Sequence, residues 1–365
     1  MEILSSVETS FADSYSEARA KFLSACTGAD VKAWVNPNKG PKGEELACDA
    51  AWFGDAKAPR VMVVISATHG AEGYCGSGIQ LDWLDGGGAQ HLGPDTAVLM
   101  IHGLNCYGFA WDRRVTEEGA DLNRNFLDFS QPLPENPGHD ELVDAFVPPS
   151  LDEKTLEEAE SKLAAYRAEH GEKAFQSARK AGQYRHAHSM FFGGFEATWA
   201  NRTLGEVFDH FQLASREIVS VVDVHTGLGP FGYGEPICGH KRGTVALDRV
   251  LSMYGDSTGL PAEGASFSIP LNGSQGNFWR PRLEDRYTYV ALEFGTYSQD
   301  NSRKSLRADH WLHNQGSFDW DDEQVRAIKN AIKQHYYPAT PDWKEMVLWR
   351  GRQILRQTLE GLGRF

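Results

Sequence analysis

Cysteine is scarce and scattered in this chain of 365 residues, and no stretch stays apolar for long. The 5 cysteines show no metal-knuckle spacing, which predicts free thiols in a reducing, cytoplasmic compartment. No run approaches the roughly 18 consecutive apolar residues of a membrane span. The N-terminal segment lacks a basic start followed by an apolar core, so no secretory signal is expected. These absences favour a globular cytoplasmic protein that does not act at a membrane.

The chain also has fewer basic than acidic residues. Lysine and arginine number 36 against 50 aspartates and glutamates, which gives a net charge of −14. Nucleic acids and anionic membranes bind basic surfaces, so neither is expected as a partner. Hydrophobic residues make up 41% of the chain, which is ordinary for a folded protein. The length is sufficient for one large domain with a sizeable core.

Several apolar, β-branched runs predict the strands of a sheet. Four of them are continuous enough to be buried on both faces, namely 61–68, 97–104, 217–227 and 287–296. Two earlier strand-like runs, 30–35 and 44–53, flank a turn-rich segment. Helical patterns lie between the runs, which predicts an α/β fold: a mixed, mostly parallel twisted sheet flanked by helices.

Polar residues stand where the buried strands end. His69, Asn105, His225 and Glu293 each lie at or near the C-terminal end of a different predicted strand. In α/β sheets that edge is where ligand sites form. Packing alone does not readily explain four strands that each deliver a polar group to one edge, so we expect a functional site there.

Three of these polar groups suit a divalent metal. Catalytic zinc takes three nitrogen or oxygen ligands and leaves one position open. His69-x-x-Glu72 places two such groups just after a strand, with glycines around them that permit close backbone approach. His225 supplies a third, and Asp223, two residues earlier on the same strand face, is placed to orient its imidazole. Taken singly, the His-x-x-Glu pair is also common on surfaces, and His225 also fits a satisfied core histidine.

Arginines and a buried carboxylate accompany these ligands. Arg113 and Arg114 shortly precede the segment Asp121-Leu-Asn-Arg-Asn-Phe126. The planar fork of arginine grips a carboxylate or polarises a carbonyl oxygen, and asparagine adds a directed donor. Glu293 lies in an otherwise apolar strand, where a carboxylate is seldom buried without a purpose. It is the candidate general base.

Together these motifs resemble the zinc carboxypeptidase superfamily, including its aspartoacylase-like deacylase branch. The resemblance rests on HGAEG, DLNRNF with its preceding arginines, DVHTG and EFGT, and covers about residues 60–130 and 215–300. It implies zinc held by His69, Glu72 and His225, with Glu293 as general base. It further implies that Asn123 and Arg124 grip a substrate carboxylate, and that Arg114 or Arg113 stabilises the oxyanion.

The sequence departs from this pattern in two respects. The Asp-x-His form around His225 is closer to the deacylase and cytosolic carboxypeptidase branches than to the digestive enzymes. No motif selects a substrate-capping tyrosine among Tyr287, Tyr289 and Tyr297. Two other histidine pairs, His186-x-His188 and His310-x-x-His313, are weaker metal candidates because no acid follows them on a strand end.

The expected protein is therefore a zinc hydrolase that cleaves an amide or peptide bond beside a free carboxylate. The alternatives are an N-acyl amino acid deacylase, amidohydrolase or esterase, and a non-catalytic zinc-site binding protein. A small peptide or N-acyl amino acid is the expected substrate, and homo-oligomerisation stays open. We predict a catalytic domain of residues 1–335 that contains a helical insertion or lid at 129–205, followed by a C-terminal helical extension at 336–365.

Overall fold

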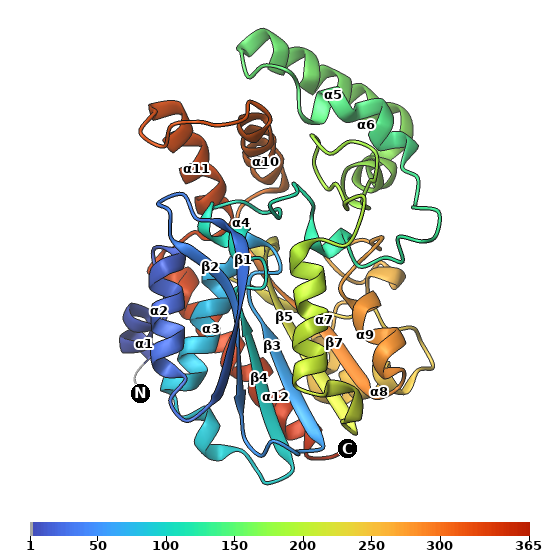
Figure 1. The fold of residues 1–365 in the computed structure, drawn as a ribbon. Coiled ribbons are helices and arrows are strands. Elements are labelled where there is room, and N and C mark those ends of the chain that lie inside the picture. Colours follow the sequence, from blue (N-terminus) through green and yellow to red (C-terminus); the bar gives the residue numbers. More distant parts are fainter. Residues whose placement is uncertain (1–2) are drawn as a thin grey trace.

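The computed structural model describes residues 3–365 and is built around one seven-stranded sheet (Figure 1). The strands lie in the order β1-β2-β4-β3-β5-β7-β6. Their bounds are β1 Asp30–Lys39, β2 Glu45–Phe53, β3 Arg60–Ile65, β4 Thr96–His102, β5 Ile218–Phe231, β6 Gly234–Ile237 and β7 Tyr287–Gly295. Strands β4, β3, β5 and β7 are parallel, whereas β1–β2, β2–β4 and β6–β7 pair antiparallel. The predicted fold class, a mixed and mostly parallel sheet, is confirmed.

Helices cover both faces of this sheet (Figure 1). One face carries α1 Ile3–Ser10, α2 Tyr15–Ala25, α3 Gly73–Asp85, α8 Val245–Tyr254 and α12 Pro341–Leu362, and the other carries α7 Trp199–His210 and α9 Gly276–Leu283. The alternation of the strands explains the two cores. In β3, Met62 and Val64 join the first core, whereas Val61 and Val63 join the second.

Two further helix pairs lie beyond the C-terminal ends of the parallel strands (Figure 1). They are α5 Pro137–Phe146 with α6 Glu153–Lys180, and α10 Gln299–Asn314 with α11 Glu323–Tyr336. A third core joins them, with Leu163 of α6 and Phe146 of α5 in the same buried cluster as Leu306 of α10. Gly171 interrupts α6 with a φ of +83°, a conformation that glycine adopts without strain.

The segment 129–205, predicted as a helical insertion, and the segment 336–365, predicted as a C-terminal extension, pack differently against the sheet. Helices α5 and α6 stand away from the sheet, whereas α7 covers it (Figure 1). Helix α12 buries Trp343, Val347 and Ile354 in the first core of the sheet. The domain boundaries stay a prediction. Among residues 3–365, no helix combines the length and apolar character needed to cross a bilayer.

Candidate metal centre

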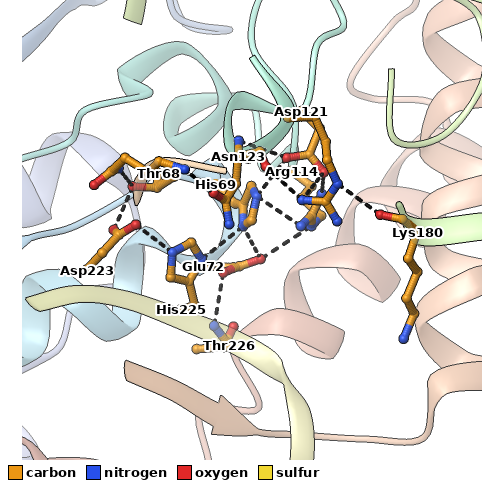
Figure 2. Close-up of polar contacts among 12 residues, drawn as sticks. Thr68, His69, Glu72, Arg114, Asp121, Asn123, Lys180, Asp223, His225 and Thr226 are labelled. Atoms are coloured by element: carbon orange, nitrogen blue, oxygen red, sulfur yellow. Dashed lines mark hydrogen bonds and ion pairs between the residues drawn. The ribbon is translucent and has the colours of Figure 1, made fainter. Parts of the chain in front are cut away.

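His69, Glu72 and His225 meet at the C-terminal edge of the sheet, although the last two are 153 positions apart in the sequence. His69 follows β3, Glu72 ends the short 3-10 helix η1 (Gly70–Glu72), and His225 lies on β5. One ligand atom from each residue falls within 4.8 Å of the others. His69 Nδ1 is 2.9 Å from Glu72 Oε1, and His225 Nδ1 is 3.3 Å from Glu72 Oε2 (Figure 2). Two imidazole nitrogens and a carboxylate around one point are a donor set that suits zinc.

The outward-facing nitrogen of each imidazole is tied to a buried carboxylate. His225 Nε2 lies 2.7 Å from Asp223 Oδ2, and His69 Nε2 lies 2.9 Å from Asp121 Oδ1 (Figure 2). The Thr68 hydroxyl donates to Asp223 Oδ1 at 2.7 Å and thereby fixes that carboxylate. Carboxylates in this position orient the ring and leave the opposite nitrogen free to bind metal. Asp223 therefore lies where the sequence predicted, and Asp121 is a counterpart that the sequence did not indicate.

The charges of this cluster are strongly coupled. Burial raises the pKa of Glu72, but the two imidazoles outweigh burial and hold it far below its usual range. Burial lowers the pKa of His225, but Asp223 and Glu72 carry it well above its usual range. The surroundings therefore keep Glu72 as a carboxylate, which is the form that binds a metal.

Close packing of two loops shapes this cluster. Ala71 N donates to Arg113 O at 2.7 Å, and Gly70 N donates to Arg114 O at 3.2 Å, so η1 lies against the segment that carries both arginines. A Cβ atom on Gly70 would stand only 2.0 Å from the Gly108 carbonyl carbon, which excludes any other residue at position 70. The glycine of the His-Gly-Ala-Glu motif thus permits close backbone approach, as the sequence suggested.

The structure separates the two arginines that the sequence left open. Arg114 lines the cavity, and its Nε lies 3.4 Å from Glu72 Oε1 while its NH1 pairs with Asp121. Arg113 points away and binds Asp309 on α10, with 3.0 Å between Nε and Oδ2. Of the two, Arg114 therefore faces the cavity, and Arg113 anchors the loop that carries it.

Asn123 and Arg124 lie in the 3-10 helix η3 (Leu122–Arg124) and both line the cavity. Asn123 Oδ1 accepts from Gln275 N at 2.8 Å, which leaves its amide nitrogen available. Arg124 is 3% exposed, and its guanidinium donates to Asn123 O at 2.9 Å and lies over the Phe191 ring. Its only carboxylate neighbour at ion-pair distance in the described part of the chain is Asp121, at 3.8 Å. The pair is therefore held in place, and Arg124 shares the carboxylate of Asp121 with Arg114.

Glu293 lies on β7 directly beside His225 of β5, since the two residues are register partners in the sheet. Its Oε1 accepts from Leu228 N at 3.0 Å. Burial and the nearby negative charge of Glu72 raise the pKa of Glu293 to about 8. A carboxyl group with a raised pKa beside a candidate metal centre is suited to accept and return a proton.

One cavity of about 380 Å³ is lined by the three candidate ligands and by Arg114, Asn123, Arg124 and Glu293. One part is lined by the charged groups described above, and another part is apolar, with Ile237, Ile269, Leu271 and Ala291. Tyr287 and Tyr289 line it, but Tyr289 OH donates to Asp223 and Tyr297 is not among the lining residues. A cavity of this size accommodates a small ligand.

Sequence reasoning missed three residues of this site: Asp121, Lys180 at the end of α6, and Tyr336 at the end of α11. Asp121 begins the segment 121–126, in which the sequence analysis assigned roles only to Asn123 and Arg124. Nothing in the helical patterns around Lys180 or Tyr336 indicated a cavity. Among residues 3–365, the group of side chains placed to hold a metal ion is that of His69, Glu72 and His225. The alternative candidate His186 instead pairs with Asp140, with 2.9 Å between Nε2 and Oδ1.

Fold and site together define an α/β protein with a candidate metal centre at the C-terminal edge of its sheet. The chain matches, over residues 11–350, the family model described as a protein of unknown function, DUF2817. It belongs to this family. No curated protein matches its sequence.

Several solved structures are similar to parts of this chain. Carboxypeptidase A from Helicoverpa armigera is 12% identical, with 96% of this chain and 75% of that chain covered and a TM-score of 0.49. Thrombin activatable fibrinolysis inhibitor is 10% identical, with 98% and 77% covered and a TM-score of 0.48. An aspartoacylase family protein from Mesorhizobium loti is 12% identical, with 79% and 67% covered and a TM-score of 0.37.

Proposed function

We propose that this protein is a zinc-dependent hydrolase that cleaves an amide or peptide bond next to a free carboxylate. The observation that carries the proposal is the convergence of His69, Glu72 and His225 on one point, with each imidazole backed by a carboxylate. Nitrogen and oxygen donors in this number fit a catalytic zinc with an open position, and do not fit the all-oxygen sites of magnesium or calcium.

The residues around the centre have complementary tasks. His69, Glu72 and His225 would hold the zinc ion, whose contribution when bound would be to acidify a water and polarise the scissile carbonyl. Glu293 takes a proton from the attacking water and gives it to the leaving nitrogen. The Arg114 guanidinium donates to the oxygen that gains charge, in a cavity where such a donor is strong because water is displaced. Asn123 and Arg124 hold the substrate carboxylate, which fixes the scissile bond beside Glu293.

Two forms of this activity suit the cavity. A carboxypeptidase would take a short peptide, and an N-acyl amino acid deacylase would take a single acylated residue. Lys180 and Phe191 from the 129–205 segment line the cavity, which favours short substrates in both cases. We propose that this segment acts as a lid over the site.

Paired substrates test the proposal. Zinc-loaded protein is assayed on C-terminal dipeptides and on N-acyl amino acids, each with a free and an amidated carboxylate. We expect hydrolysis of at least one free acid, loss of turnover on chelation, and little turnover of the amides. Arg124→Ala should lower kcat/KM for the free acid by about 10–100-fold, the worth of a charge-assisted contact. Exposed Arg356→Ala is the matched control. Equal rates on free and amidated substrates would refute the assignment.

A further inference from the structure

The last residue of α6 brings an ammonium group into the cavity. Lys180 lines the cavity, and its backbone carbonyl accepts from Arg124 Nε at 2.9 Å. Its Nζ donates to Gln299 Oε1 at 2.5 Å, and Gln299 in turn donates to Gly227 O at 2.8 Å. The Lys180 backbone is thus fixed to Arg124, while its side chain is positioned by the turn that follows His225.

This ammonium group has no ion-pair partner among residues 3–365. Its hydrogen-bond partner is a neutral amide, and no carboxylate within residues 3–365 forms an ion pair with it. Partial burial of a cation without an anionic partner is unfavourable, and an anionic ligand would offset this cost.

A second unpaired cation stands beside Lys180. Arg179 is 2% exposed, and its Nε has no hydrogen-bond partner. Its NH2 reaches only the hydroxyl of Ser302, at 3.4 Å, and Ser302 lines the cavity. Burial and repulsion by Arg179 lower the pKa of Lys180 to about 7. Arg179 and the protonated form of Lys180 therefore place positive charge at this end of the cavity, which a bound anion would stabilise.

We propose that Lys180 is a specificity residue that binds a second anionic group of the substrate, so that the preferred substrate carries two carboxylates. One carboxylate lies at Asn123 and Arg124, and the other lies between Lys180 and the turn at Gly227. The inference rests on the proposed function for the identity of the substrate, but the anion site itself rests only on the residues described here.

Isosteric substrates measure this preference. N-acyl-glutamate is compared with N-acyl-glutamine, and N-succinyl with N-butyryl amino acids, because each pair differs by one carboxylate. In the zinc-loaded wild type, we expect kcat/KM for the diacid of one pair to exceed that for its partner by about 10-fold. Lys180→Gln should bring this ratio close to one, and Lys180→Arg should restore it. Lys173→Gln, an exposed lysine on the same helix, should keep the wild-type ratio.

A binding measurement separates this inference from the proposed function. Titration calorimetry of the purified protein with glutarate and with butyrate should show tighter binding of glutarate, and Lys180→Gln should abolish the difference. If no amide is hydrolysed but this difference is found, the proposed function fails and the anion site stands. The inference is overturned if Lys180→Gln leaves both the substrate ratio and the glutarate-to-butyrate ratio at their wild-type values.

Discussion

His225 and Glu293 are register partners on the neighbouring parallel strands β5 and β7, and both side chains line the same cavity. Adjacent strands lie about 4.8 Å apart, so a residue pair in this position acts on the same small volume. The sheet itself therefore holds a candidate metal ligand beside a candidate proton acceptor. Rigid elements of this kind keep catalytic groups in place better than loops do.

Replacement of Glu293 tests its role as a base. We expect Glu293→Gln to lower kcat by about 10²–10⁴-fold, because the amide cannot accept a proton from the attacking water. Zinc content should stay at the wild-type level, since Glu293 is not among the three converging ligands. Steady-state kinetics and elemental analysis on the same preparation give both numbers. A variant with full turnover on a genuine substrate would remove Glu293 from the mechanism.

The adjacent arginines should differ in their effect on turnover. Arg114→Ala should lower kcat/KM far more than Arg113→Ala does, because of the two only Arg114 lines the cavity. Both variants should lose stability, since each breaks a buried ion pair, although Asp309 keeps Lys329 Nζ at 2.6 Å when Arg113 is removed. Kinetics and thermal unfolding of both variants check the prediction. An equal loss of kcat/KM in both would contradict the distinction drawn from their positions.

Asp223 should affect metal affinity. Asp223→Asn replaces the carboxylate that binds His225 Nε2 at 2.7 Å, so we expect zinc affinity to fall by about 10–100-fold. Competition with a chromophoric chelator measures the change. Asp144→Asn, at an exposed position on α5, is the control and should bind zinc as the wild type does. Unchanged affinity in Asp223→Asn would mean that His225 does not depend on this carboxylate.

The preference for a diacid should depend on pH. Burial, Arg179 on its own helix, and Arg124 and Arg114 lower the pKa of Lys180 to about 7, against the opposing effect of Glu293. Because Lys180 is a cation only below this pKa, the ratio of kcat/KM for diacid and monoacid should be highest below pH 7 and fall above it. The titration of groups that act equally on both substrates cancels in this ratio. A ratio that is flat from pH 6 to about 9 would contradict the prediction.

The sequence predicted those parts of the molecule that depend on local pattern. Continuous β-branched runs marked the buried strands, and polar residues at their ends marked the edge where His69 and His225 meet. The short edge strand β6 was missed because its sequence, Gly-Glu-Pro-Ile, has no strand pattern. Its pairing with β7 is determined by the neighbouring strand.

Other parts of the site depend on tertiary contacts that no local pattern records. Arg113 and Arg114 look equivalent in sequence, and only the position of Asp309 on α10 separates them. Asp121 meets His69 across 52 residues. Lys180 ends a long polar helix whose pattern predicts solvent exposure, and packing of that helix beside Arg124 brings the lysine to the cavity.

Metal content tests the central claim most directly. Protein purified without chelators is analysed by inductively coupled plasma mass spectrometry, together with His69→Ala, His225→Ala and, as control, exposed His91→Ala. We predict about one zinc per chain in the wild type and in the control, as expected for a site with three protein ligands, and far less in the two ligand variants. A wild type that binds no transition metal, or ligand variants that retain a full equivalent of zinc, would contradict the account.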